Sequence, residues 1–205
     1  MNILAISPHP DDLEFGCGGT LLKYSRAGHK VFLLVLTPGG VGGEPVVRMK
    51  EQERSAAYIG AKKLFWGGFT DTEMVDNRDL ILKIEDTVKK TSPDIVLMNY
   101  IDDTHQDHRA AAHAGISATR HIKEVMFYES PTSQGFEPDI FVDVTAIVNN
   151  KLKLLKIHAS QINKVRIKNL GIVEIARSCM NFRGFQGRVK FAEAYKGVRI
   201  LKKIE

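Results

Sequence analysis

One histidine and two adjacent aspartates stand close together near the start of the chain. They are His9, Asp11 and Asp12 in the stretch SPHPDDLEFGCGGT, which directly follows the apolar run MNILAI. Neighbouring carboxylates repel each other unless a cation or a proton is shared between them. Imidazole and carboxylate groups together suit zinc and similar divalent metals. We therefore interpret this stretch as one half of a metal site.

The stretch NYIDDTHQDHRAAAH contains the same residue types and supplies the second half of the predicted site. It carries His105 and His108 in an H-x-x-H spacing, after an apolar run and before an Ala-rich helical segment. Alone, either stretch also fits a turn followed by an N-capped helix. Together they favour a metal site, if the fold brings them to one edge of a sheet. The accompanying aspartates are Asp102, Asp103 and Asp107.

Neighbouring residues of these two motifs are expected to divide the work of a hydrolytic centre. Such a centre needs three protein ligands, an open position for water and a nearby carboxylate that takes the proton of the water. Adjacent residues in a tight turn rarely both bind one ion, so Asp11 and Asp12 are expected to be one ligand and one base. The same reasoning gives His105 and His108 one ligand and one imidazolium that stabilises an oxyanion.

The elements that must position these motifs alternate between strands and helices. Continuous apolar runs between helical segments are typical of a parallel sheet that is covered on both faces. The sequence therefore predicts an α/β fold with an open, mostly parallel, Rossmann-like sheet and helices on both faces. Strands are expected over 1–7, 30–37, 63–68, 94–100, 124–130 and 139–145, and helices over 20–28, 46–61, 77–92, 108–122, 145–162 and 169–180.

This fold class predicts where the site lies. Ligands of open α/β proteins bind at the carboxyl ends of the strands. Loops 9–12, 39–44 and 100–108 each follow a predicted strand, so we expect them to meet at one edge of the sheet. The glycines of FGCGGT lack the G-x-G-x-x-G spacing and the P-loop lysine of a phosphate cradle. We expect them to let a helix pack closely beneath the metal loop.

Length and composition are those of one globular domain. The chain has 205 residues, 43% of them hydrophobic and 26% charged, and we expect a single domain over 1–205. No apolar run reaches the ~18 residues of a membrane span, and no basic region precedes the first apolar run. Two cysteines provide no disulfide framework and suggest a reducing compartment. We therefore expect a cytoplasmic protein.

Charge is distributed unevenly along the chain. The net charge is +5, with +11 carried by residues 146–205 and −6 by residues 1–145. The basic residues are scattered and show no regular aromatic interleaving, which favours a solvated face, or one facing an acidic face of another subunit, over a nucleic-acid partner. A phosphate-binding module that uses the Gly-rich loops, and a nucleic-acid interface on the basic segment, are the alternatives from other functional classes.

PHPDDLEFGCGGTL followed by HQDHRAA resembles the LmbE-like, or PIG-L-like, zinc-dependent N-acetylglucosamine deacetylases. LTPGG, RMKEQERSAAYIGA, FWGGFTDTEMV, FEPDIFVDVT and KLLKIHASQI extend the resemblance over about residues 1–165. It implies the LmbE-like fold, removal of the acetyl group from an N-acetylglucosamine-type substrate, and a homo-oligomer, trimeric or hexameric. It also implies one Zn²⁺ per chain, with other divalent metals possible. The alternative is an amidase that acts on a larger amide, such as a thiol-sugar conjugate.

The resemblance also assigns roles that the residues alone leave open. Asp11 becomes the general base and His105 the oxyanion partner, and either could protonate the leaving amine. The implied metal ligands are His9, Asp12 and His108.

Two further positions match family residues that hold sugar hydroxyls, and the chain also departs from the family pattern. The matching residues are Arg48, otherwise a surface charge, and Asp71, otherwise an N-cap. The departures are Pro8, Leu13 and Gln106, where many members have alanine, an acidic residue and proline. None of these is a proposed ligand, so they bear on the substrate more than on the chemistry.

Overall fold

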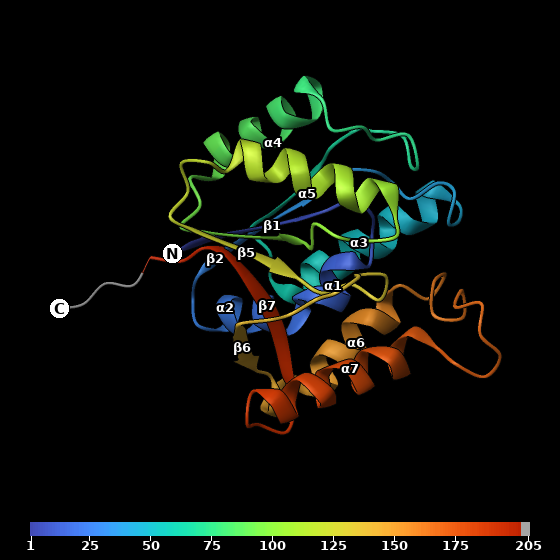
Figure 1. The fold of residues 1–205 in the computed structure, drawn as a ribbon. Helices are drawn as coiled ribbons and strands as arrows, with labels where there is room; N and C mark the ends of the chain where they lie inside the picture. The colour runs from blue at the N-terminus through green and yellow to red at the C-terminus, as the bar shows by residue number, and fades with distance from the viewer. Residues whose placement is uncertain (202–205) are drawn as a thin grey trace.

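A seven-stranded sheet forms the centre of the computed structural model, which describes residues 1–201 (Figure 1). Its strand order is β3-β2-β1-β4-β5-β7-β6. Strands β1 to β5 are parallel, whereas β7 runs antiparallel to both β5 and β6. The prediction of a mostly parallel α/β sheet is therefore confirmed. The strands are β1 (Asn2–Ser7), β2 (Lys30–Val35), β3 (Lys63–Trp66), β4 (Ile95–Asn99), β5 (Glu124–Tyr128), β6 (Ile140–Asp143) and β7 (Ala192–Arg199).

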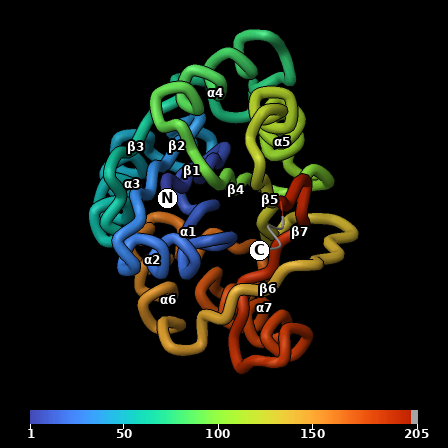
Figure 2. Tube along the Cα trace, turned by 90° about the vertical axis from the view of Figure 1, so that its left-hand side faces the viewer, coloured from blue at the N-terminus to red at the C-terminus, as the bar shows by residue number. Residues whose placement is uncertain are grey.

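Helices cover both faces of the sheet. Figure 2 shows α4 and α5 on one side of the strands and α1, α2, α6 and α7 on the other. None of the helices within residues 1–201 combines the length and apolarity needed to cross a bilayer. The helices are α1 (Asp12–Gly16), α2 (Gly18–Arg26), α3 (Pro45–Ile59), α4 (Arg78–Thr91), α5 (Gln106–Ala118), α6 (Val148–Ile157) and α7 (Ile172–Gln186).

Residues 3–6 of strand β1 are all apolar because they are buried on both faces of the sheet. Ile3 and Ala5 pack into the core formed with α1, α2, α3 and α6. Leu4 and Ile6 point the opposite way, into the core beneath α4 and α5. A strand covered on both faces has no solvent side, so its sequence shows no polar alternation.

The short helix α1 packs tightly beneath the loop that carries His9. A Cβ atom at Gly16 would lie 2.1 Å from Cδ2 of Tyr128, so a larger residue would displace the ring. The Tyr128 hydroxyl in turn donates a 2.9 Å hydrogen bond to the carbonyl of Ile6 in β1. The expected close packing of this glycine-rich stretch is confirmed.

Expectations for the C-terminal third are partly wrong. The helix predicted over 145–162 is a 3-10 turn (Thr145–Ile147) followed by α6, which ends at Ile157. It stops there because His158 leaves the helical conformation, with its ring buried beside Glu14. Strand β7 was not predicted, because its buried Glu193 interrupts the apolar pattern. The carboxylate of Glu193 accepts hydrogen bonds from the backbone of α2 and forms an ion pair with a buried lysine of α6.

Candidate metal centre and active site

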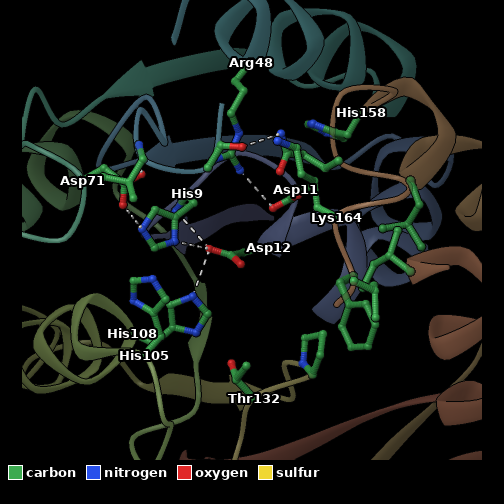
Figure 3. A pocket seen from close by; sticks show the side chains of 18 of the residues that line it. His9, Asp11, Asp12, Arg48, Asp71, His105, His108, Thr132, His158 and Lys164 are labelled. Carbon is green, nitrogen blue, oxygen red and sulfur yellow. Dashed lines mark hydrogen bonds and ion pairs between the residues drawn. The ribbon is translucent and has the colours of Figure 1, made fainter. Parts of the chain in front are cut away.

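The predicted loops meet at one edge of the sheet. In the register of the parallel strands, Ser7 at the end of β1 lies beside Val35 of β2, and Ile6 lies beside Met98 of β4. The loops after these strands therefore leave the sheet together. Figure 3 shows the side chains that they contribute to one cavity.

The three predicted metal ligands lie together: the two histidines converge on one carboxylate oxygen of Asp12. Asp12 Oδ2 lies 3.4 Å from His9 Nδ1 and 3.4 Å from His108 Nε2, and both contacts are drawn in Figure 3. The two histidines are 6% and 4% exposed, and their ring centroids are 5.5 Å apart. Two nitrogens and one oxygen thus face a common point, as a three-ligand site requires.

The outer nitrogens of both imidazoles are held by buried carboxylates. His9 Nε2 lies 3.1 Å from Asp71 Oδ1 and 3.1 Å from Asp107 Oδ2. His108 Nδ1 lies 3.1 Å from Asp103 Oδ2. A carboxylate on the outer nitrogen of a metal-binding histidine fixes its tautomer and leaves the inner nitrogen free for the metal. Both histidines therefore have the support that metal ligands need.

The charge balance also fits a cation. Burial lowers the pKa of His9, but its contacts with Asp107, Asp12 and Asp71 outweigh this effect and raise the pKa well above its usual value. Burial is likewise outweighed at His108, where mainly Asp12 and Asp103 raise the pKa to about 9. Four buried or nearly buried carboxylates thus draw positive charge into the site, and Asp107 Oδ1 lacks a hydrogen-bond partner. A divalent ion would supply that charge.

Other donor combinations exist within residues 1–201. Donor atoms lie within 4.8 Å of one another in two groups: His9, His105 and His108, and His9, Asp71 and Asp107. In the second group, the His9 nitrogen that faces the carboxylates is the outer one. The predicted set of His9, Asp12 and His108 uses the inner nitrogens, although its role as the ligand set stays a prediction.

His105 forms the N-cap of α5 and is oriented by its neighbour. Its Nδ1 accepts a 3.2 Å hydrogen bond from the backbone N–H of Asp107, which places the ring proton on Nε2. Burial and the neighbouring His9 and His108 lower its pKa. The structure therefore favours a neutral donor at His105 over the imidazolium expected from the sequence.

Asp11 has an unusual backbone and a perturbed carboxyl group. It adopts φ 88° and ψ −21°, the left-handed region that non-glycine residues rarely occupy. Burial and the adjacent Asp12 carboxylate raise its pKa to about 6, against the opposing effect of Arg48 and His158. The side chain keeps 26% of its surface exposed and lines the cavity. A carboxylate that titrates near neutrality suits a general base.

Arg48 is buried, so its interpretation as a surface charge is wrong. Its Nη1 donates to the carbonyl of Gly39 at 2.7 Å, and its Nη2 donates to that of Pro10 at 2.8 Å. A Cβ atom at Gly39 or Gly42 would lie 2.0 or 2.7 Å from Nη1. The Gly-rich loop is therefore wrapped around the guanidinium group.

Asp71 is also buried and does not cap a helix, so the N-cap interpretation is wrong. It contacts His9 and accepts a 2.8 Å hydrogen bond from the backbone N–H of Val41. Burial raises its pKa, but the contact with His9 outweighs this effect and brings the pKa to about 2. Both Arg48 and Asp71 line the cavity, where sugar contacts of either residue stay predictions.

The sequence did not reveal the supporting residues of the site. Asp103 and Asp107 belong to the second motif, but only the structure shows which imidazole each one holds. His158 and Glu14 lie buried beside the cavity, 3.4 Å apart between Nε2 and Oε2. In the sequence, His158 was marked only by its position within the helix expected over 145–162, and Glu14 only by its place in the first motif.

The cavity has a volume of about 460 Å³, which is within the range of small-molecule sites. The predicted metal ligands and Asp11 line it, together with several residues between positions 161 and 172. Fold and site together define an α/β protein with the arrangement of a metal-dependent hydrolase.

The chain belongs to the PIG-L family. It matches the family described as "PIG-L: GlcNAc-PI de-N-acetylase" over residues 4–119. It is 33% identical to a diacetylchitobiose deacetylase of Thermococcus kodakarensis, over 78% of this chain and 69% of the relative. The family resemblance found in the sequence is thereby confirmed.

Solved structures agree with this fold. The N,N'-diacetylchitobiose deacetylase of Pyrococcus horikoshii superposes with a TM-score of 0.85 and 26% identity, covering 96% of this chain and 83% of that chain. The 4-carboxy-2-hydroxymuconate hydratase of Pseudomonas putida KT2440 also gives a TM-score of 0.85, at 19% identity and complete coverage of both chains. The latter likeness shows the fold alone, so the site residues and the family carry the functional argument.

Proposed function

We propose that this protein is a zinc-dependent hydrolase that removes the acetyl group from an N-acetylglucosamine-type substrate, giving acetate and a free amino sugar. The observation that carries the proposal is the convergence of His9 Nδ1 and His108 Nε2 on Asp12 Oδ2, in a cavity that the carboxylate of Asp11 also lines. Membership of a de-N-acetylase family supports the same reaction class.

The ligands and the base have separate roles in this proposal. His9, Asp12 and His108 hold the metal, and Asp103 keeps the His108 ring in the metal-binding tautomer. When bound, a zinc ion supplies Lewis acidity that polarises the acetamide carbonyl and makes water acidic near neutral pH. Asp11, which lies next to the ligand Asp12, accepts the proton of the attacking water.

His105 stabilises the charge that develops on the acetamide oxygen. Its Nδ1 is occupied by a backbone N–H, so its Nε2–H is the group available to the substrate. Donors of this kind typically contribute ~10²–10³ in rate. A neutral imidazole is a poor acid, so Asp11 returns its acquired proton to the nitrogen as the C–N bond breaks. The structure thus supports one of the two proton donors that the sequence left open.

The relatives named as diacetylchitobiose deacetylases support a glycoside of N-acetylglucosamine as the substrate. No contact among residues 1–201 favours the alternative, an amidase that acts on a larger amide. Zinc is proposed because two imidazoles and one carboxylate are its usual ligands, and iron or cobalt would use the same set. The homo-oligomeric state and the cytoplasmic location stay predictions.

Acetate release tests this function directly. Purified protein would be incubated with N,N'-diacetylchitobiose, untreated, after chelation, and after chelation followed by added Zn²⁺. We expect acetate release that chelation abolishes and zinc restores. N-butyrylglucosamine and N-acetylglucosamine would be compared in parallel to separate a deacetylase from a broader amidase. Release that survives complete metal removal, or faster cleavage of the longer acyl group, would contradict the proposal.

A further inference from the structure

Both polar groups of the peptide bond between Pro10 and Asp11 are bound by side chains of α3. The carbonyl of Pro10 accepts a 2.8 Å hydrogen bond from Arg48 Nη2. The N–H of Asp11 donates to Gln52 Oε1 at 3.3 Å. Arg48 and Gln52 are four residues apart, so they lie on the same face of the helix, one turn from each other. One face of α3 therefore forms hydrogen bonds with both the carbonyl and the N–H of this peptide bond.

The side-chain amide of Gln52 has no freedom to turn over. Its Nε2 donates a 2.9 Å hydrogen bond to Glu14 Oε1, which also accepts from the hydroxyl of Ser55. Gln52 and Glu14 are both 0% exposed, and Glu14 lies near the buried ring of His158. Because Glu14 must accept, the nitrogen of Gln52 faces Glu14 and its oxygen faces Asp11.

The peptide bond between Pro10 and Asp11 lies next to a strained backbone conformation. Asp11 adopts the left-handed conformation, which is unfavourable for an aspartate and persists only when surrounding contacts enforce it. This backbone turn separates two adjacent side chains, as Figure 3 shows for Asp11 and Asp12. Asp12 Oδ2 faces the two imidazoles, whereas Asp11 Oδ1 lies 3.5 Å from Arg48 Nη2.

We propose that Arg48 and Gln52 are positioning residues, which hold Asp11 in the strained conformation that keeps its carboxylate off the metal and free to act as the base. This inference rests on the proposed deacetylase function. It gives a physical reason why neighbouring aspartates take different roles. Gln52 is the sharper probe, because it is fully buried and does not line the cavity, so any effect on turnover must pass through other residues.

Replacement of Gln52 by leucine removes the acceptor for the Asp11 N–H. With N,N'-diacetylchitobiose as the substrate, we expect Gln52→Leu to lower kcat about tenfold to a hundredfold, the usual cost of a misplaced catalytic group. KM should change by less than about twofold, and the zinc content should equal that of the wild type. Thr87→Val is the matched control, because Thr87 is a buried polar residue of α4 on the opposite face of the sheet; its kcat should be unchanged.

A double-mutant cycle separates positioning from general damage. Asp11→Asn removes the base, and asparagine, like aspartate, can adopt the left-handed conformation when its surroundings enforce it. If Gln52 acts through Asp11, adding Gln52→Leu to Asp11→Asn should cost less than about twofold of the residual rate. An equal loss in both backgrounds, a loss of zinc, or an unchanged kcat in Gln52→Leu would overturn the inference.

Two further measurements keep the test decisive. Should Gln52→Leu fail to fold, Gln52→Met, which is unbranched and of similar length, is assayed in the same cycle and read in the same way. Failure of the proposed function is recognised separately. Absence of zinc-dependent acetate release by the wild type would refute the function whatever the Gln52 variants do, whereas full activity of Asp11→Asn would refute the role of Asp11 as the base and the inference with it.

Discussion

Asp103 holds the outer nitrogen of His108, and asparagine at this position tests how much that contact contributes to metal affinity. Asp103 Oδ2 lies 3.1 Å from His108 Nδ1 and accepts a 2.5 Å hydrogen bond from Ser130 Oγ. Its Oδ1 accepts from the backbone N–H of His105 at 2.8 Å. Asparagine has only one accepting terminal atom, so its NH₂ group would face one of these N–H donors.

The expected loss follows from this geometry. Carboxylate partners of metal-binding histidines typically contribute 10–100-fold to affinity, or ~1.4–2.7 kcal/mol at 25 °C. Asp103 is 2% exposed, so water cannot take over its role. We therefore expect the zinc Kd of Asp103→Asn to rise about 30-fold to 100-fold. Once saturated with zinc, the variant should keep kcat within about threefold of the wild type, because Asp103 does not line the cavity.

Competition with a chromophoric chelator at fixed pH measures this Kd. The matched control is Asp102→Asn, which removes the charge of the neighbouring aspartate. Asp102 is exposed, and its carboxylate makes no hydrogen bond or ion pair with any of residues 1–201. Its replacement should leave the Kd unchanged. Equal Kd values for both variants, or a wild-type Kd in Asp103→Asn, would refute the role assigned to Asp103.

Three other substitutions probe the remaining parts of the site. Asp11→Ala should retain zinc but lose ~10²–10⁴ in kcat, since it removes the base; loss of zinc with activity would make Asp11 a ligand. His105→Ala should also retain zinc and lose ~10²–10³ in kcat, whereas zinc loss would favour the three-histidine ligand group. Gly39→Ala should lower Tm more than Gly68→Ala: both glycines have positive φ, but only a Cβ at Gly39 meets Arg48. Equal Tm shifts would exclude that contact.

Local sequence patterns were sufficient to predict the architecture that carries the site. Continuous apolar runs indicated strands buried on both faces, and a parallel sheet requires helical crossovers between them. That topology brings the residues after β1 and β4 to one edge, so His9 and His108 could be predicted to meet. The prediction depended on the parallel direction of the strands, which the alternation of strands and helices indicates, whereas the strand order that makes β1 and β4 neighbours came from the structure.

Contacts between distant segments determined what the sequence could not show. Strand β7 forms between β5 and β6, where its buried Glu193 is compensated by the backbone of α2 and by Lys151 of α6. In the sequence, Arg48 could be a surface charge; in the structure, the Gly-rich loop surrounds its guanidinium group. These contacts of Glu193 and Arg48 depend on the packing of segments that are distant in the sequence, so the local periodicity of the sequence does not predict them.

The division of roles between the two adjacent aspartates has the same origin. The sequence indicated that Asp11 and Asp12 must act differently, because one ion rarely binds both. Only the tertiary structure shows the conformation that separates them, with a left-handed backbone at Asp11 and hydrogen bonds from α3 to the preceding peptide. The residue types determine which chemistry is available. The direction in which each side chain points depends on α3, a helix that follows these residues in the sequence and packs against them in the fold.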